Sequence, residues 1–232
     1  MIERKLIIAI DGPAGAGKST VASHLARLLG YVNLETGAMY RALGLRAIES
    51  QVPLEDEQRL ADLARHSHIS LVPTENGNRV LLDGRDVSER IRESDVTSAA
   101  SQVSVHPTVR EWMVARQREM GKQGGVVMEG RDIGTKVFPD ADVKIFLDAN
   151  EDVRAERRIR QHALDQDADR AKKVADEMRQ RDRRDTNRAA SPLVAASDAV
   201  ILDSSHMSLE EVIDRIEELV KEKLSRRVAA QS

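Results

Sequence analysis

Residues 5–20 read KLIIAIDGPAGAGKST, and this stretch decides the fold. The apolar run Lys5–Ile10 predicts a short buried strand, and a helical pattern over Lys18–Leu29 follows it. Between the two, residues 12–19 fit the spacing G-x-x-x-x-G-K-[ST]. A strand, a glycine-rich turn and a helix in this order are the context that a phosphate-binding P-loop requires.

The residues of this loop have separate tasks in holding a nucleotide. Glycines let successive backbone N–H groups turn toward phosphate oxygens, and the N-terminus of the following helix favours the same anion. Lys18 is expected to reach the β- and γ-phosphates, and the Ser19 hydroxyl is expected to bind Mg²⁺. The predicted ATP-binding residues are Gly12, Pro13, Ala14, Gly15, Ala16, Gly17, Lys18, Ser19 and Thr20.

Strand and helix patterns alternate along the rest of the chain. Further strands are predicted at Tyr31–Leu34, Gly125–Glu129, Val143–Leu147 and Ala199–Asp203. Helices are predicted from an N-cap at Thr36 to about Glu49, over Val96–Lys122 with a break at His106-Pro107, over Glu151–Arg188, and over Leu209–Leu224. The pattern favours an α/β fold, with a central parallel five-stranded sheet flanked by helices. The runs Ile69–Val72 and Arg79–Leu82 predict a small antiparallel insert within about 63–92.

Composition limits the classes of protein that fit. The length of 232 residues suits one α/β domain with insertions, and the absence of cysteine excludes disulfides and thiol chemistry. A net charge of −3 argues against a general nucleic-acid binder. Because no apolar stretch approaches the roughly 20 residues of a membrane span and no export signal is visible, we expect a soluble cytoplasmic protein without membrane contact.

A P-loop alone does not name the reaction, because switches, ATPases and small-molecule kinases share it. The sequence lacks an Asn-Lys-x-Asp motif, which counts against a GTPase switch. Arginines suggest a second phosphate site, since their planar forks hold phosphate oxygens in pairs. Arg41 lies one turn into a predicted helix, and Arg131 with Asp132 follows a predicted strand at its carboxyl end, where open α/β sheets bind ligands. A surface arginine and an ion-paired turn are the alternatives.

A third arginine cluster lies in RDRRDTNR, residues 181–188. A solvated helix face is the ordinary interpretation of such a charge run. The preceding apolar stripe consists of Ala171, Val174, Ala175 and Met178. Continued at helical spacing, the stripe reaches Asp182 and Asp185, with Arg181 and Arg188 beside them. An inward face that becomes charged needs a partner, which favours a cleft that holds an anion.

These motifs together resemble the bacterial cytidylate kinases over nearly the whole chain. The blocks that carry the resemblance are IDGPAGAGKST, ETGAMYR, SQVSVHPTVRE, EGRDIGTKVFPDADVKIFLDA and RDRRDTNRAASPLVAASDAVILDS. The resemblance implies that Arg41, Arg131 and Arg188 hold the acceptor phosphate. It also implies that Ser101, Arg110 and Asp132 read the cytosine, and that Arg181 and Asp185 hold the ribose. Thr36 stands where serine is frequent and is included among the CMP-binding residues.

The resemblance further implies a reaction and a division of the chain. ATP would phosphorylate CMP, and dCMP as a second acceptor, with Mg²⁺, and Lys18, Arg131 and Arg188 would be the catalytic residues. One domain over 1–232 would comprise a core (about 1–35, 94–153 and 189–232), a monophosphate-binding region with the insert (36–93), and a lid with an arginine-rich helix (154–188). The lid itself would span about Arg154 to Ala168, and the protein would be a monomer.

Some assignments stay open at this point. Glu129 is the acid at the end of a predicted strand, so it could meet Mg²⁺ through water. The resemblance leads us to expect aspartate there, and because the glutamate side chain is longer, Glu129 is left out of the catalytic residues. The alternatives for the function are a P-loop kinase for another acceptor, such as UMP, AMP or a small metabolite, and a nucleotide-switched binding protein with little turnover.

Overall fold

The five predicted central strands form one parallel sheet in the computed structural model, which describes residues 5–74, 77–161 and 167–229. The order is β2-β6-β1-β7-β8. The strands are β1 (Ile7–Asp11), β2 (Val32–Glu35), β6 (Val126–Gly130), β7 (Val143–Asp148) and β8 (Val200–Asp203). Every residue of β1 and β6 is buried, as expected for central strands covered on both faces. The predicted fold class is therefore confirmed.

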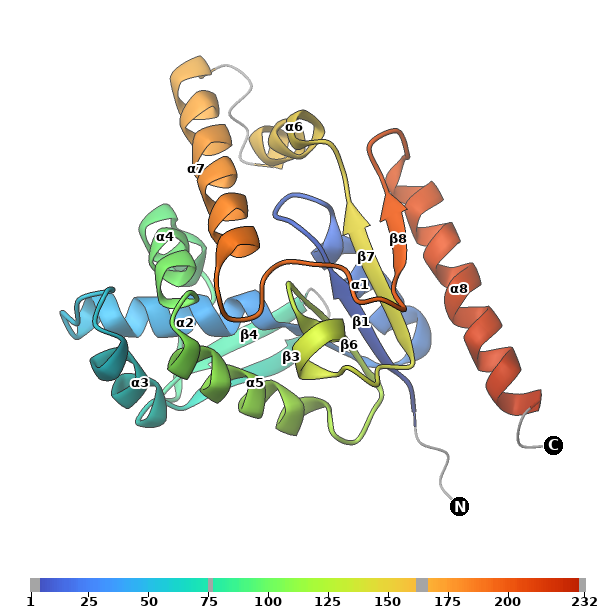
Figure 1. Cartoon of the computed structure of the whole chain (residues 1–232), viewed down its shortest axis with the longest axis horizontal. Helices are drawn as coiled ribbons and strands as arrows, with labels where there is room; N and C mark the ends of the chain where they lie inside the picture. The colour runs from blue at the N-terminus through green and yellow to red at the C-terminus, as the bar shows by residue number, and fades with distance from the viewer. Residues whose placement is uncertain (1–4, 75–76, 162–166, 230–232) are drawn as a thin grey trace.

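Helices cover both faces of this sheet and enclose two separate apolar clusters (Figure 1). On one face lie α1 (Lys18–Leu29) and α8 (Leu209–Ala229). On the other lie α2 (Thr36–Glu49), α3 (Glu57–Arg65), α4 (Ser94–Val103) and α5 (Pro107–Gly121). Side chains of β6 alternate between the two clusters, because successive strand residues point to opposite faces: Val126 and Met128 join one, and Val127 joins the other.

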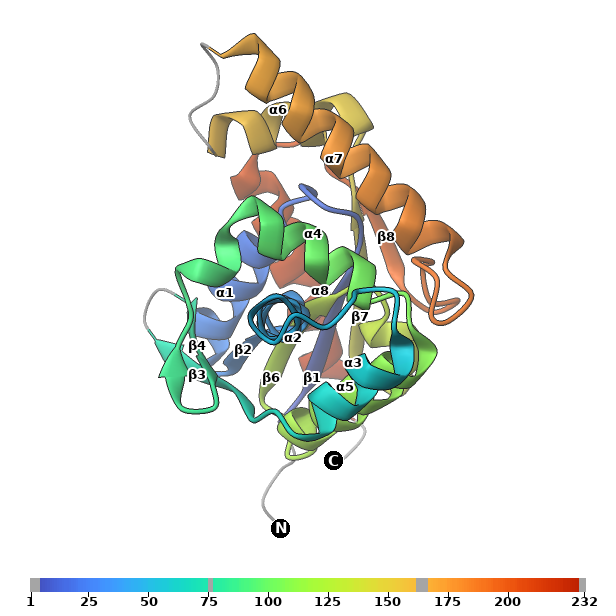
Figure 2. The same cartoon turned by 90° about the vertical axis from the view of Figure 1, so that its left-hand side faces the viewer.

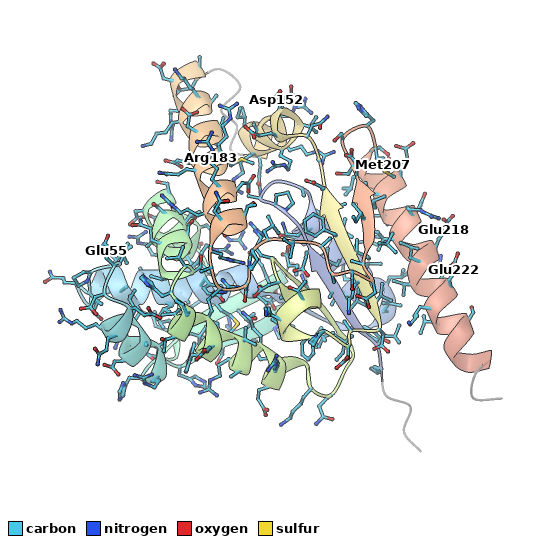
Figure 3. The ribbon with its side chains drawn as sticks, viewed as in Figure 1. Glu55, Asp152, Arg183, Met207, Glu218 and Glu222 are labelled. Atoms are coloured by element: carbon cyan, nitrogen blue, oxygen red, sulfur yellow. The ribbon has the colours of Figure 1, made fainter. Side chains whose placement is uncertain are left out.

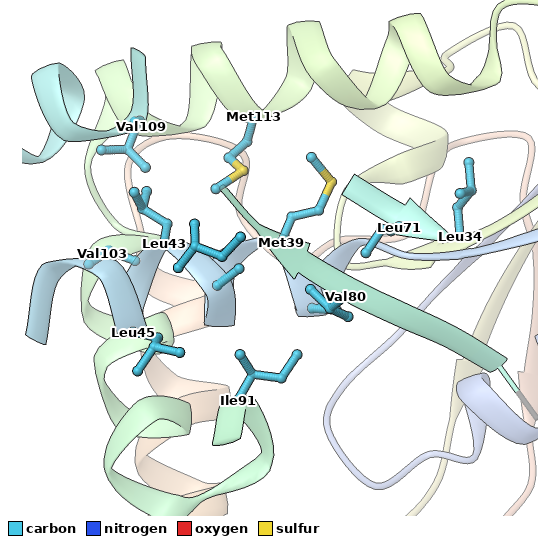
Figure 4. Close-up of a cluster of buried hydrophobic side chains, with 14 of the residues drawn as sticks. Leu34, Met39, Leu43, Leu45, Leu71, Val80, Ile91, Val103, Val109 and Met113 are labelled. Atoms are coloured by element: carbon cyan, nitrogen blue, oxygen red, sulfur yellow. The ribbon is translucent and has the colours of Figure 1, made fainter. Parts of the chain in front are cut away.

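The predicted insert is a separate antiparallel sheet of β3 (Ile69–Thr74), β4 (Gly77–Leu82) and β5 (Arg85–Asp86), followed by a 3₁₀ turn, η1 (Arg90–Arg92). Its apolar residues do not form a core of their own. Leu71, Val80 and Ile91 belong to the cluster built around Met39 and Leu43 of α2 (Figure 4). The insert is thus packed against α2.

Two helices, α6 (Glu151–Gln161) and α7 (Ala168–Asn187), lie beyond the carboxyl ends of the strands (Figures 1 and 2). Of the expected lid over Arg154 to Ala168, residues 154–161 form the end of α6, and residues 162–166 lie outside the described part of the chain. Across the described helices, none combines the length and apolar character needed to cross a membrane.

Three local features differ from the sequence-based expectation. The N-cap of α2 is Glu35, not Thr36, which is the first helical residue and uses its hydroxyl to donate to the Glu129 carbonyl at 2.7 Å. The helix α3 was not predicted. A single π-helical turn, η2 (Ile133–Val137), follows β6 where no helix was expected. Both η2 and the hydroxyl of Thr36 lie next to the loop that carries Arg131.

Candidate active site

The P-loop has the geometry that its glycines require. Gly12, Gly15 and Gly17 have φ values of 145°, 77° and 96°, which L-residues with side chains rarely adopt. A Cβ atom on Gly12 would lie 1.9 Å from the carbonyl oxygen of Leu147 in β7, so no other residue fits there. The helix α1 begins at Lys18, and its free N–H groups face the loop. The Lys18 ammonium is buried and donates to the carbonyl of Pro13 at 2.5 Å.

Buried charges of both signs surround Lys18. Burial, assisted by the positive charge of Arg131, lowers the pKa of Lys18 to about 7. Burial and the neighbouring Glu35 raise the pKa of Glu129, which pairs with Glu35 in the β2–β6 register. The Ser19 side chain acts in the opposite sense and lowers this pKa, and the Oε1 atom of Glu129 has no hydrogen-bond partner among the described residues.

Asp11, which sequence analysis did not single out, fixes the loop after β6. Its two carboxylate oxygens accept from the backbone N–H groups of Ile133 at 2.8 Å and Gly134 at 2.7 Å. Burial is the main cause that raises the pKa of Asp11 to about 6. The contact joins the strand that leads into the P-loop to the turn after Arg131 and Asp132, and so holds the two loops in position relative to each other.

Arg110 and Asp132 form a buried ion pair. The Nη2 atom of Arg110 lies 2.5 Å from Oδ2 of Asp132, with side chains 3% and 7% exposed. Arg110 also donates to the Ser104 carbonyl at 3.0 Å, and its guanidinium lies 5.4 Å from the ring centroid of Tyr40. Yet Nε of Arg110 and the Tyr40 hydroxyl are buried without partners in the described structure. Unsatisfied buried polar atoms of this kind suit a polar ligand.

Asp185 is ion-paired with two of the arginines that were predicted to hold a second phosphate. Arg131 Nε lies 2.9 Å from its Oδ2 atom, and Arg188 Nη1 lies 3.3 Å from Oδ1. Burial alone would raise the pKa of Asp185, but Arg131, Arg181 and Arg188 outweigh it and hold the pKa below its usual value. Burial and Arg131 lower the pKa of Arg181 to about 10. Such a concentration of positive charge attracts an anion.

The remaining predicted acceptor residues lie at the edges of this cluster. Arg41 is ion-paired with Glu35, and its positive charge contributes to the lowered pKa of Arg181. Ser101 is buried on α4, where its hydroxyl accepts from Arg184 of α7 at 3.2 Å. The structure therefore brings Lys18, Arg131, Arg181 and Asp185 together, and joins Arg110 to Asp132. Ser101 is linked to the others through α7.

Sequence reasoning missed several residues that complete the site. Asp11, Glu35 and Tyr40 stand within or beside motifs already singled out, so their position next to those motifs was a usable signal. Arg154 and Asp182 are ion-paired against the P-loop. Asp182 lay on the predicted inward face of α7, but nothing in the sequence indicated which group it would meet.

A parallel sheet with a P-loop after β1, and a cationic cluster opposite that loop, define the class of P-loop phosphotransferases. Comparison with known proteins agrees. The sequence model described as cytidylate kinase matches residues 8–222. The cytidylate kinase of Geobacillus kaustophilus is 49% identical over 96% of this chain and 100% of its own, and that of Bacillus subtilis is 45% identical over 96% and 99%. The chain belongs to the cytidylate kinase family.

The solved structures show the same fold at lower similarity. An uncharacterized protein from Eubacterium ventriosum is 13% identical to this chain, with a TM-score of 0.51, and the match covers 94% of this chain and 99% of that one. At that identity the likeness extends to the fold alone.

Proposed function

We propose that this chain transfers the γ-phosphoryl group of ATP to CMP, and also to dCMP, giving the diphosphate and ADP. The observation that carries the proposal is the arginine cluster around Asp185, opposite Lys18 of the P-loop, in a chain of the cytidylate kinase family. A switch protein needs one phosphate site, whereas a kinase whose acceptor is a phosphate needs two.

The acceptor needs no general base in this reaction, because a phosphate oxygen of CMP is already ionised near neutral pH. It attacks the γ-phosphorus in line, and the P–O bond to ADP breaks. Lys18, Arg131 and Arg188 would stabilise the negative charge on the transferring group, and Arg41 would help to hold the acceptor phosphate. Ion pairs with Asp185 orient Arg131 and Arg188, and such preorganised charge is a main requirement for this kind of catalysis.

The cytosine ring would be read by Arg110, Asp132 and Ser101. The carboxylate of Asp132 accepts from the 4-amino group that cytosine has and uracil lacks, and the buried guanidinium of Arg110 donates to ring acceptors. With uracil the carboxylate would lose its donor in a buried site, which is costly. Asp185 and Arg181 would hold the ribose, and Thr36 would line the phosphate end.

The residues beside the P-loop fit a Mg²⁺ ion. The unpartnered Oε1 atom of buried Glu129, next to the Ser19 hydroxyl, is an oxygen donor set of the kind this cation prefers. Ser19 would bind Mg²⁺ directly, and Glu129 would orient its water. When bound, the ion neutralises charge on the β- and γ-phosphates.

We also propose how the enzyme is organised. Residues 36–93 would form the monophosphate-binding region, and residues 154–188 would form the lid and arginine helix, closing over ATP and excluding water. From the resemblance to bacterial cytidylate kinases we also propose a monomer that acts in cytoplasmic pyrimidine nucleotide metabolism, without nucleic-acid or membrane partners.

The test is ADP formation from ATP and Mg²⁺ with each nucleoside monophosphate in turn. We expect fast turnover with CMP, measurable turnover with dCMP, weak turnover with UMP, and slow ATP hydrolysis without acceptor. Preference for AMP, GMP or UMP would overturn the assignment of cytosine. The absence of acceptor-dependent turnover would favour a nucleotide-binding protein instead.

A further inference from the structure

One turn of α7 contacts the donor side and the acceptor side of the site at once. Asp182 accepts from the backbone N–H of Ala14 in the P-loop at 3.3 Å. Two residues further, Arg184 donates to Ser101 on α4. Asp185, in the same turn, pairs with Arg131. Asp182 and Asp185 are three residues apart and share one face of α7, while Arg184 points in another direction, so this turn lies between the P-loop, α4 and the loop after β6.

Arg154 completes the contact between α7 and the P-loop. Its Nη1 atom donates to the carbonyl of Ala14 at 3.0 Å and is ion-paired with Asp182, while its Nε atom donates to the carbonyl of Ala149 at 2.9 Å. The Arg154 and Asp182 side chains are only 9% and 17% exposed. The pair therefore engages both the N–H and the C=O group of one P-loop residue.

The packing around Gly15 makes this contact tight. A Cβ atom on Gly15 would lie 2.9 Å from the carbonyl oxygen of Arg154 and 2.9 Å from Cε of Met178. Both α6 and α7 thus rest directly against the P-loop backbone (Figure 2). We call the pair of Arg154 and Asp182, with Ala14, the clasp.

We infer that Asp182 is a positioning residue that couples occupation of the P-loop to binding in the acceptor pocket. The inference rests on the proposed function, because it takes CMP as the acceptor. Phosphates held by the P-loop order Ala14, and through the clasp they order the turn of α7 that carries Asp185. A ligand that then binds near Asp185 pays a smaller conformational-entropy cost, so each ligand raises the affinity of the protein for the other.

The experiment measures the Kd of CMP by calorimetry, with and without a non-hydrolysable ATP analogue and Mg²⁺. For the wild type we expect CMP to bind at least about 5-fold tighter with the analogue present. In Asp182→Asn, which keeps the size of the side chain and removes its charge, we expect this factor to fall below about 2. The Kd of CMP alone should stay within about twofold, because the partners that Asp182 has among the described residues are Ala14 and Arg154.

Matched variants separate coupling from general damage. Arg183→Gln changes an exposed residue on the same helix (Figure 3), and should keep both the turnover and the coupling factor. Arg154→Lys keeps the positive charge but loses the planar guanidinium group, so it should reduce the coupling factor as Asp182→Asn does. It therefore serves as the test variant if Asp182→Asn does not fold. A merely structural role would lower the melting temperature or weaken both ligands and leave the factor unchanged.

Three results would overturn the inference: no coupling in the wild type, coupling retained in both clasp variants, or loss of coupling in Arg183→Gln as well. Failure of the proposed function has a different signature. It would appear as a wild type that neither binds nor phosphorylates CMP, and the inference would fall with it. If the wild type phosphorylates CMP but both clasp variants keep the wild-type coupling factor, the role of Asp182 is wrong and the proposed function stands.

Discussion

Replacing Asp132 with asparagine tests the reading of the base most directly. The carboxylate lies 2.5 Å from Arg110, and both side chains are nearly inaccessible to water. The amide oxygen of asparagine can still accept from Arg110, which also keeps its bond to Ser104. The folding cost is therefore less than the loss of a whole buried pair. What the variant loses is the charged acceptor for the 4-amino group of cytosine.

The size of the effect follows from one charge-assisted hydrogen bond, about 2 kcal/mol, which is roughly 30-fold in kcat/KM. The amide also offers an N–H donor that suits O4 of uracil. We therefore expect the ratio of kcat/KM for CMP to that for UMP to fall by at least about 30-fold in Asp132→Asn, measured as ADP formation with each acceptor.

The control is Asp140→Asn, the same chemical change at an exposed position, which should leave the ratio unchanged. Thermal unfolding of both variants shows whether the protein is intact. If Asp132→Asn is folded and its CMP-to-UMP ratio stays within about threefold of the wild type, Asp132 does not read the base, and the reasoning from its buried pair with Arg110 is refuted.

Further predictions concern charge and packing. Asp185→Asn leaves Arg131 buried without its counter-charge, so urea unfolding should show a loss of about 3 kcal/mol. Because the folded pKa of Asp185 is lowered from 3.8, this stabilisation is present above about pH 4 and lost as the pH falls further; a pH-independent difference would contradict it. The free protein holds Lys18 at a pKa of about 7, and bound phosphate should restore its proton. Calorimetry of ATP-analogue binding in buffers of different ionisation enthalpy should therefore give an uptake of about 0.9 proton at pH 8 and about 0.1 at pH 6; equal values would count against it. In Gly44→Ala the new Cβ would lie 2.9 Å from the backbone nitrogen of Ala100, so urea unfolding should show a loss of about 1–3 kcal/mol, and an unchanged stability would show that α2 and α4 can separate there.

Local sequence signals predicted the P-loop and the two elements that flank it well. The spacing of residues 12–19 and the apolar run before it located the P-loop, and α1 has the predicted bounds. Strand bounds differ by one or two residues, as for β1, which starts at Ile7 and includes Asp11. The reason is that strand ends depend on pairing partners, and β1 pairs with β6 and β7 far along the chain.

Long-range contacts explain most of what sequence reasoning could not supply. Asp11 meets Ile133 across 122 positions, and Ala14 meets Asp182 across 168. Hydrophobic periodicity cannot predict contacts between residues so far apart in sequence, because these contacts result from the crossover connections of the sheet. Thr36 is instructive in another way: a hydroxyl at a helix start predicted a cap, but the nearby carbonyl of Glu129 is its actual partner. The inward face of α7, by contrast, was predicted, and Met178 and Asp185 are buried.

The two apolar clusters on opposite faces of the sheet have a consequence for how this protein can change. The apolar cluster with α1 and α8 and the apolar cluster with α2 and the insert meet mainly at the central strands. Substitutions in one cluster should have additive effects with those in the other. On the division of the chain proposed above, the choice of monophosphate can therefore change with little effect on the ATP side. Removal of the insert should destabilise the α2 cluster, because Val80 and Leu82 are part of it.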